Sequence, residues 1–316
     1  MQKVIKTAVG TFLAIYLAEK FQIKYGVTAG IVAIISIQTT KRESLKIAGE
    51  RVAASFIGLL LAALFFYFGG YNPLIFGIFV LVFMPLCLKF NIFQGFLVTV
   101  VLAAHMLTEK SVSLAMLLNE GAILFIGAAV AIGLNMYMPN LTGKIKELQN
   151  DIDELMKRLL NDMGDVLLTG AVQIDEEKLF TQLREKLEKG RELAFNEYNN
   201  SLLSPSQNHI ELFNLKRSQY KVLVRMRRHF FKLFISSAHT EMIADFTKKV
   251  GNSIGTDTLY MEALDELGKL KETFRQMPLP QSRVEFESRA GLLQFFNDLE
   301  EFLELKKDFL KKYKLN

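Results

Sequence analysis

The first half of the chain consists of apolar runs separated by short polar or glycine-containing turns. A helix needs about 20 apolar residues to cross a hydrocarbon core about 30 Å thick, and several of these runs are shorter. The second run has 15 residues, which reach only about 22 Å at about 1.5 Å per residue. Such a run is either tilted or ends part-way beside a polar cavity, because non-helical backbone at membrane depth must be covered by protein or water. The pattern predicts six spans, at residues 4–18, 26–40, 52–68, 73–88, 92–107 and 112–138.

The second half of the chain has the pattern of amphipathic helices. Its first row of apolar residues is Ile145, Leu148, Ile152, Leu155 and Leu159, at alternating steps of three and four. This spacing places the side chains on one helix face and indicates packing in a bundle. We therefore expect an all-α protein, with a six-span membrane domain at residues 1–140 and a cytoplasmic antiparallel helical bundle at residues 141–316. The other predicted bundle helices are residues 175–199, 206–250, 257–276 and 284–313.

The distribution of charge separates the same two parts. Residues 1–140 contain 10 Lys and Arg against 5 Asp and Glu, whereas the remainder contains 28 of each. Short cytoplasmic loops of membrane proteins are enriched in Lys and Arg, so these loops predict the orientation. Both termini are expected in the cytoplasm, since this places eight basic residues inside (Lys3, Lys6, Lys41, Arg42, Lys46, Lys89, Lys144 and Lys146) and three outside (Lys20, Lys24 and Lys110).

Arg51 is a charged residue at the start of the third predicted span, directly after Glu50. An ionisable side chain in hydrocarbon is costly unless it faces a cavity or a partner. A guanidinium stays charged and matches the geometry of a carboxylate, which makes Arg51 a candidate fixed cation for an anionic substrate. The alternative is that Arg51 snorkels to the cytoplasmic headgroups.

Two further ionisable residues occur in the predicted spans, His105 in the fifth and Glu120 in the sixth. They are candidates for a proton relay if the protein is a proton-coupled transporter. The alternative is that each lies at the outer interface, because Glu109, Lys110 and the following turn are close in sequence.

A row of basic residues marks one face of the predicted helix at residues 206–250. This basic stripe could contact anionic lipid or an acidic regulator. Otherwise it is solvated or pairs with the acidic helix that carries Glu301, Glu304 and Asp308. Nucleic acid is disfavoured as a partner, because this half of the chain has no net charge. The basic stripe consists of Arg217, Lys221, Arg225, Arg228 and Lys232, at steps of four, four, three and four.

Motifs of enzymes and cofactor sites lack the context that they require. Residues 251–255 match the nucleophile elbow letter for letter, but the preceding pattern is helical, whereas the elbow follows a strand. The four histidines have no zinc-binding spacing, and the single cysteine, Cys87, lies in an apolar run. No glycine-rich phosphate loop is present in the sequence. We expect no enzyme activity, no metal and no cofactor.

The segment between the second and third apolar runs resembles a known family motif. It reads Gln38-Thr39-Thr40, then Ser44-Leu45-Lys46, then Glu50-Arg51-Val52-Ala53-Ala54-Ser55-Phe56-Ile57-Gly58. This is similar to the aromatic acid exporter family, in the wider group of fusaric acid resistance proteins and plant aluminium-activated malate channels. The sequence departs from the motif at Ala54-Ser55, where relatives often have Gly-Thr. The six-span layout with a helical second domain is that of the bacterial one-repeat branch.

This resemblance implies a multi-pass protein of the bacterial cell membrane, which exports aromatic or other organic anions and works as a homodimer. Small residues four apart, such as Ala129 and Gly133, allow close helix packing either within one copy or at a dimer seam. The alternative function is a non-transporting membrane sensor or scaffold that acts through its cytoplasmic domain. The predicted substrate-binding residues are Arg51, Lys41, Arg42 and Lys46, which attract the anion, and Gln38, Thr39 and Thr40, which hydrogen-bond it.

Overall fold

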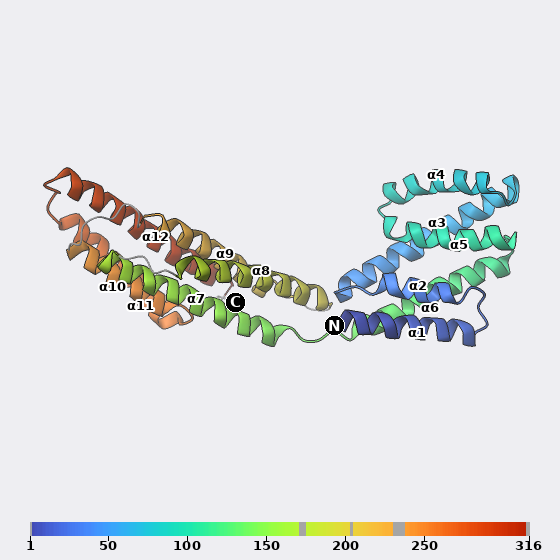
Figure 1. Cartoon of the computed structure of the whole chain (residues 1–316), viewed down its shortest axis with the longest axis horizontal. Helices are drawn as coiled ribbons and strands as arrows, with labels where there is room; N and C mark the ends of the chain where they lie inside the picture. The colour runs from blue at the N-terminus through green and yellow to red at the C-terminus, as the bar shows by residue number, and fades with distance from the viewer. Residues whose placement is uncertain (1, 171–174, 203–204, 230–237, 314–316) are drawn as a thin grey trace. The chain divides into compact units, whose positions relative to one another are not determined.

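A computed structural model describes residues 2–170, 175–202, 205–229 and 238–313 of the protein (Figure 1). The protein is 85% helical, and the described residues contain no strand. This confirms the all-α prediction. The chain divides into two compact units, the first formed by Met1–Pro139 with Asn199–Pro205 and the second by Asn140–Tyr198 with Ser206–Asn316.

In the first unit, one α-helix overlaps each predicted apolar run, and the fifth run also contains the 3-10 helix η1. Helix α2 packs between α1 and α6, and α3 contacts α4, α5 and α6 (Figure 1). Only α3 and α6, among the described helices, are both long and apolar enough to cross a membrane, and α2, α4 and α5 are shorter apolar helices. The six-span topology therefore stays a prediction. The helices are α1 (Gln2–Lys20), α2 (Val27–Ser36), α3 (Lys41–Gly69), α4 (Pro73–Lys89), the 3-10 helix η1 (Phe93–Gly95), α5 (Phe96–Glu109) and α6 (Leu114–Met136).

Side-chain caps set the helix starts in this unit. Asn72 accepts a hydrogen bond from the Ile75 N–H at 3.0 Å, and Pro73 occupies the first helical position of α4. Ser113 caps α6 in the same way, accepting from the Met116 N–H at 3.2 Å. Such caps satisfy N–H groups that have no partner within the helix. The turns between the helices are therefore encoded locally.

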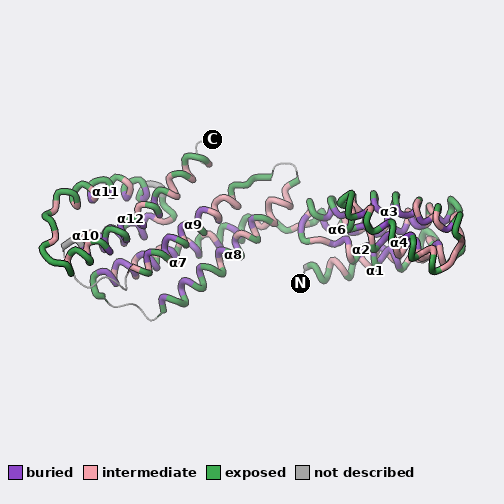
Figure 2. Tube along the Cα trace, turned by 90° about the horizontal axis from the view of Figure 1, so that it is seen from above, coloured by how far each residue is buried: buried purple, intermediate pink, exposed green. Residues whose placement is uncertain are grey.

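The first unit has an apolar exterior and several polar groups inside. Figure 2 shows that buried and exposed residues alternate along its helices. Phe56 and Phe125 are 68% and 73% exposed, whereas Arg51 and Glu120 are buried. Most of the exposed large apolar side chains of the described chain belong to this unit. A water-soluble surface rarely carries so much contiguous apolar area. This distribution is the one expected of a helical domain in lipid.

The second unit is a bundle of long amphipathic helices. Helix α7 packs along α10, and α9 packs along α12. The predicted apolar row of α7 faces the core, with Ile145, Ile152 and Leu159 fully buried. Gly190 allows α8 to approach Phe213 of α9 closely, because a β-carbon at residue 190 would collide with that ring. The helices are α7 (Thr142–Thr169), α8 (Glu176–Asn200), α9 (Asn208–Arg227), α10 (Ala238–Ser253), α11 (Asp257–Gln276) and α12 (Arg283–Tyr313).

One predicted helix of the second unit is divided in two. The segment predicted as a single helix at residues 206–250 contains α9 and α10, and Lys232 of the basic stripe lies between them, outside the described residues. Gly251, Asn252 and Ser253 form the last turn of α10. Residues 251–255, which match the nucleophile elbow, therefore lie at the end of a helix and do not follow a strand.

Candidate functional site

A break between α2 and α3 forms a polar corner inside the first unit. Helix α2 has only 10 residues and ends at Ser36, and Ile37 after it is extended. Thr40 then caps α3, since its extended backbone (φ −134°, ψ 154°) lets its hydroxyl accept from the Glu43 N–H at 3.4 Å. The corner therefore holds the carboxyl end of one helix next to the amino end of another. Such ends carry backbone groups that need outside partners.

Arg51 supplies donors to the end of α2. Its side chain is buried, with the residue only 4% exposed. Nη2 donates to the Ile35 carbonyl at 3.0 Å and Nε donates to the Gln94 carbonyl of η1 at 3.2 Å, while Nη1 donates to the Ser36 hydroxyl. A cation is favourable at a helix carboxyl terminus because the helix dipole is negative there. Arg51 thus ties α2 and η1 to α3.

Ser36 and Asn135 extend this polar corner to α6. The Ser36 hydroxyl donates to the Val32 carbonyl at 2.5 Å. Asn135 Nδ2 donates to the Ser36 carbonyl at 3.4 Å and to the Ser44 hydroxyl. Asn135 Oδ1 is buried and has no hydrogen-bond partner among the described residues. The corner therefore retains a buried acceptor without a donor.

The other predicted substrate-binding residues lie around the same corner. Gln38 Nε2 donates to the Ile35 carbonyl at 3.0 Å, so Gln38 and Arg51 share one acceptor. Thr39 is exposed and donates to Glu43 at 3.4 Å. Three basic residues lie in the first two turns of α3. Lys41 is half-buried, and Arg42 and Lys46 are exposed. Their role in binding a substrate stays a prediction.

The structure brings the two predicted relay residues into direct contact. His105 Nδ1 lies 2.8 Å from Glu120 Oε2, and Glu120 is fully buried. The His105 ring stacks on Tyr25 with centroids 4.1 Å apart, and its Nε2 lies 3.4 Å from the Thr28 hydroxyl. Asn119 Nδ2 donates to the other oxygen of Glu120 at 3.0 Å. A buried carboxylate bonded to an imidazole can exchange a proton with it.

Polar residues continue from this cluster to the surface of the unit. The Tyr25 hydroxyl donates to Glu109 at 3.1 Å, and Lys24 Nζ lies 3.0 Å from the other Glu109 oxygen. Lys24 is 63% exposed in its side chain. Tyr25, Thr28 and Asn119 were not singled out by the sequence pattern, because single polar residues near predicted span ends are common. Their contacts follow from the packing of the loop before α2 against α5 and α6.

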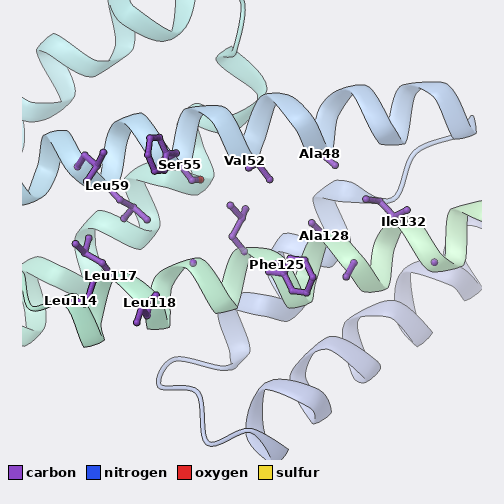
Figure 3. A pocket seen from close by; sticks show the side chains of 16 residues that line it. Ala48, Val52, Ser55, Leu59, Leu114, Leu117, Leu118, Phe125, Ala128 and Ile132 are labelled. Atoms are coloured by element: carbon purple, nitrogen blue, oxygen red, sulfur yellow. The ribbon is translucent and has the colours of Figure 1, made fainter.

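An apolar groove of about 790 Å³ lies between α3 and α6 (Figure 3). Val52 and Ala48 of α3 line one side, and Phe125 and Ala128 of α6 line the other. Ser55 is the one polar side chain among the described residues that line it, and its hydroxyl is 3.0 Å from Thr99. None of the predicted site residues lines this groove. It can receive an apolar ring or chain but offers little to a charged group.

One residue of the basic stripe, Arg225, pairs with acidic residues of α12. Arg225 Nε donates to Asp298 at 2.6 Å, and Arg225 Nη2 donates to Glu301. His229 Nε2 lies 2.9 Å from the second oxygen of Asp298. Arg217 is 3.9 Å from Glu188 of α8. The alternative of pairing with an acidic helix is therefore realised at Arg225, and a role in binding lipid or a partner stays a prediction.

The apolar exterior and polar interior of the first unit, joined in sequence to a helical bundle, define a helical membrane-type protein with a second helical unit. The chain belongs to the aromatic acid exporter family. The family model "Aromatic acid exporter family member 1" matches residues 1–138. The model "Putative aromatic acid exporter C-terminal domain" matches residues 142–307. This confirms the resemblance that the sequence motif carried, and it supports a membrane exporter-type role.

The chain is similar to two proteins of Bacillus subtilis and to one solved structure. The "Uncharacterized protein YqjA" of Bacillus subtilis (strain 168) is 28% identical over 307 residues, which are 97% of this chain and 95% of that protein. The "UPF0421 protein YgaE" of the same organism is 26% identical over 181 residues, 56% of this chain and 51% of that one. A solved structure, "Crystal structure of putative membrane protein from Clostridium difficile 630", is 23% identical with a TM-score of 0.48, covering 53% of this chain and 99% of that one.

Proposed function

We propose that the protein exports aromatic or other organic anions across the cell membrane. Membership of an exporter family supports this proposal, as does the apolar exterior of the first unit. The observation that carries it is the end of α2 inside that unit, where a buried guanidinium binds the Ile35 and Ser36 acceptors. Interrupted helices that leave polar groups at membrane depth are typical of transport sites, because such groups need protein or water around them.

The amino end of α3 attracts the anion in this proposal. Lys41, Arg42 and Lys46 lie in the first two turns of α3, and all three are at least partly exposed. The positive end of the helix dipole adds to their charge. Clustered cations raise the local concentration of an anion, and salt weakens this effect. Transport should therefore depend on ionic strength.

Arg51 has two roles in this proposal. In the described arrangement it is a positioning residue, because three of its N–H groups hold the corner together. A guanidinium has five N–H groups and prefers a carboxylate to a neutral carbonyl as acceptor. A substrate carboxylate that reaches the corner would compete with the Ile35 and Gln94 carbonyls for Arg51. That exchange would loosen the end of α2 and open the corner.

His105 and Glu120 provide proton coupling in this proposal. The proton moves between Glu120 Oε2 and His105 Nδ1, which are 2.8 Å apart. The polar contacts of Tyr25 and Glu109 lead from this pair toward solvent. An exporter driven by protons needs such a buried exchange site, since ionisable groups at membrane depth are otherwise unfavourable.

Two copies form the working unit in this proposal. Gly121, Phe125, Ala129 and Gly133 follow one another at steps of four on α6, and a β-carbon at Gly121 or Gly133 would meet no neighbour within 4 Å. Small residues on a lipid-facing helix allow a second helix to approach closely. A partner helix from another copy fits this open face of α6.

Efflux from liposomes tests the transport proposal. Purified protein is reconstituted, and efflux of a labelled aromatic carboxylate is measured with and without the triple change Lys41→Gln, Arg42→Gln and Lys46→Gln. The variant should transport about tenfold more slowly at low salt, and the difference should shrink as salt is added. The matched control is Lys89→Gln, an exposed lysine at the end of α4. Absence of flux for any anion, with the protein folded, would favour the sensor or scaffold.

A further inference from the structure

The turn between α1 and α2 holds two residues in the left-handed backbone region. Gln22 has a φ of 57° and Tyr25 has a φ of 61°. This region is unfavourable for residues with a β-carbon, because the side chain crowds the neighbouring carbonyl oxygen. Such residues persist only where surrounding contacts hold them, and they are frequent in switch regions. The turn is therefore strained, and its conformation depends on the contacts that it makes.

Asn119 of α6 holds this turn by its backbone. Its Oδ1 accepts from the Lys24 N–H at 2.9 Å, and its Nδ2 donates to the Lys24 carbonyl at 3.1 Å. These two bonds fix the orientation of the amide, since an N–H needs an acceptor and a carbonyl needs a donor. Figure 1 shows that the α1–α2 turn and the start of α6 lie at the same end of the first unit. One side chain of α6 thus fixes the strained turn.

The same amide reaches the buried His105–Glu120 pair. Asn119 Nδ2 donates to Glu120 Oε1 at 3.0 Å, and the other carboxyl oxygen, Oε2, lies 2.8 Å from His105 Nδ1. A donor bonds more strongly to an ionised acceptor than to a neutral one. A carboxylate next to a neutral imidazole loses its net negative charge when the pair takes up a proton, so the bond from Asn119 then weakens. Asn119 therefore links the charge of the pair to the backbone of the turn.

Tyr25 covers the pair from the turn. Its ring stacks on His105 with centroids 4.1 Å apart, and its hydroxyl donates to Glu109 Oε1 at 3.1 Å. Glu109 Oε2 also lies 3.0 Å from Lys24 Nζ. Helix α2 contributes the neutral Thr28, and no charged side chain of α1 or α3 forms a hydrogen bond or ion pair with the His105–Glu120 pair among the described residues. The charged groups around the pair therefore belong to the turn and to the end of α5.

We propose that residues 21–26 form a gate over this buried pair, and that Asn119 releases the gate when the pair takes up a proton. The gate rests on the proton coupling proposed above, and Asn119 is a positioning residue because it acts through the turn. Once Lys24 is released, the strained residues return to the favourable backbone region and Tyr25 moves off the pair. The gate adjoins the first residues of α2, whereas the Arg51 corner contains its last residues. The two openings thus lie at opposite ends of one short helix.

Labelling of an introduced thiol tests the gate in the full-length protein. Cys87 is replaced by alanine, and Thr28→Cys places one thiol behind the gate, where Thr28 is 8% exposed. In a second protein, Lys20→Cys places a reference thiol at the exposed end of α1. The reference is needed because every thiol reacts more slowly at acid pH as its thiolate is lost. The ratio of the Thr28→Cys rate to the Lys20→Cys rate, measured with a charged methanethiosulfonate, should rise about fivefold between about pH 8 and about pH 5.

Three variants in this background separate the role of Asn119 from simple loosening of the turn. Asn119→Ala should give a high ratio at every pH, because the turn is then released whatever the charge of the pair. Tyr25→Phe is the matched control, since it removes the bond to Glu109 and keeps the ring. It should raise the ratio and leave its pH dependence in place. Glu120→Gln is neutral at every pH, so its ratio should not change with pH, and it keeps the test decisive if Asn119→Ala does not fold.

Several results would overturn the gate. One is a ratio that does not change with pH when the turn and the pair are intact. A pH dependence that survives in Asn119→Ala would remove Asn119 from the mechanism, and one that survives in Glu120→Gln would assign the change to another group, such as Glu109. Liposome efflux is measured separately. Efflux without a pH-dependent ratio contradicts the gate alone, whereas a pH-dependent ratio without efflux of any anion supports the gate and contradicts the transport proposal.

Discussion

Replacement of Arg51 by methionine removes the donors that hold the α2–α3 corner while keeping an unbranched apolar side chain in place of the arginine stem. In the protein these donors reach the Ile35 and Gln94 carbonyls and the Ser36 hydroxyl. In the variant, Gln38 still donates to the Ile35 carbonyl. The Gln94 carbonyl and the Ser36 hydroxyl each lose the bond that Arg51 made. The perturbation is therefore confined to the corner and can be estimated from these contacts.

Two buried acceptors that lose a donor cost about 1–3 kcal/mol each. The loss of a cation at the carboxyl end of α2 adds about 0.3–1 kcal/mol. We expect Arg51→Met to lower the free energy of unfolding of the first unit by about 2–7 kcal/mol. Arg51→Lys should recover about half of this loss, because one ammonium group can reach one of the acceptors but cannot span three.

The single cysteine provides the assay. Cys87 lies in α4 and is fully buried, so a thiol-reactive dye labels it only when the first unit opens. Denaturant titration of the protein in detergent, followed by this dye, gives the free energy of unfolding of that unit. The matched control is Arg42→Met, the same change at an exposed position of the same helix. It should alter the free energy by less than about 0.5 kcal/mol, as most exposed substitutions do.

Stability and transport together decide which role Arg51 has. If Arg51→Met is as stable as the unchanged protein, the reasoning about the corner is wrong. If it is equally stable and has also lost flux, Arg51 acts on the substrate and not on the end of α2. Loss of both stability and flux, with partial recovery of both in Arg51→Lys, is the outcome that the contacts predict.

Three further outcomes are expected. Burial raises the pKa of Asp162, while the nearby Arg158 opposes this rise and Asp165 adds to it. The protein therefore loses folding stability as pH rises from the unfolded-state pKa of this group through its raised pKa. Asp162→Asn should melt higher than the unchanged protein at pH 8, and this difference, measured by far-UV circular dichroism, should vanish at acid pH. Glu120→Gln keeps the size of the side chain and one acceptor oxygen but cannot ionise, so it should slow liposome efflux about tenfold and flatten its pH dependence. Gly133→Leu should convert a dimer to a monomer in light scattering without changing the helical content, because a side chain there meets open space within one copy.

The apolar runs located the helices of the first unit but not where α3 begins. The third predicted span starts at residue 52, whereas α3 starts at Lys41. Its first three turns point Ser44, Ala48 and Arg51 inward and leave Lys46 exposed. A run of apolar residues indicates the part of a helix that faces lipid. Where the helix begins depends instead on backbone hydrogen bonds and on the Thr40 cap. Hydropathy therefore does not predict the polar first turns of α3.

The two candidate clusters differ in how far the sequence could reveal them. His105 and Glu120 are both ionisable groups inside apolar runs, so each was visible before their contact was known. The partners of Arg51 at Ile35 and Gln94 are backbone carbonyls, which no residue pattern marks. Gly95 is required for this contact, because a β-carbon there would lie 2.8 Å from the Arg51 Cα. Such a close approach of η1 to α3 emerges only from the packing.

The chemistry of the Arg51 contacts connects the fold to the proposed transport. Among the described residues, no carboxylate forms an ion pair with Arg51, and the acceptors that it reaches are two carbonyls and a hydroxyl. Dipoles of this kind stabilise a buried guanidinium less than a full negative charge does. These hydrogen bonds therefore keep α2 in place, but no negative charge among the described residues pairs with the positive charge of Arg51. In the proposed transport function, an organic anion would supply the missing charge at this corner, where an interrupted helix and a buried cation without an ion pair among the described residues occur together.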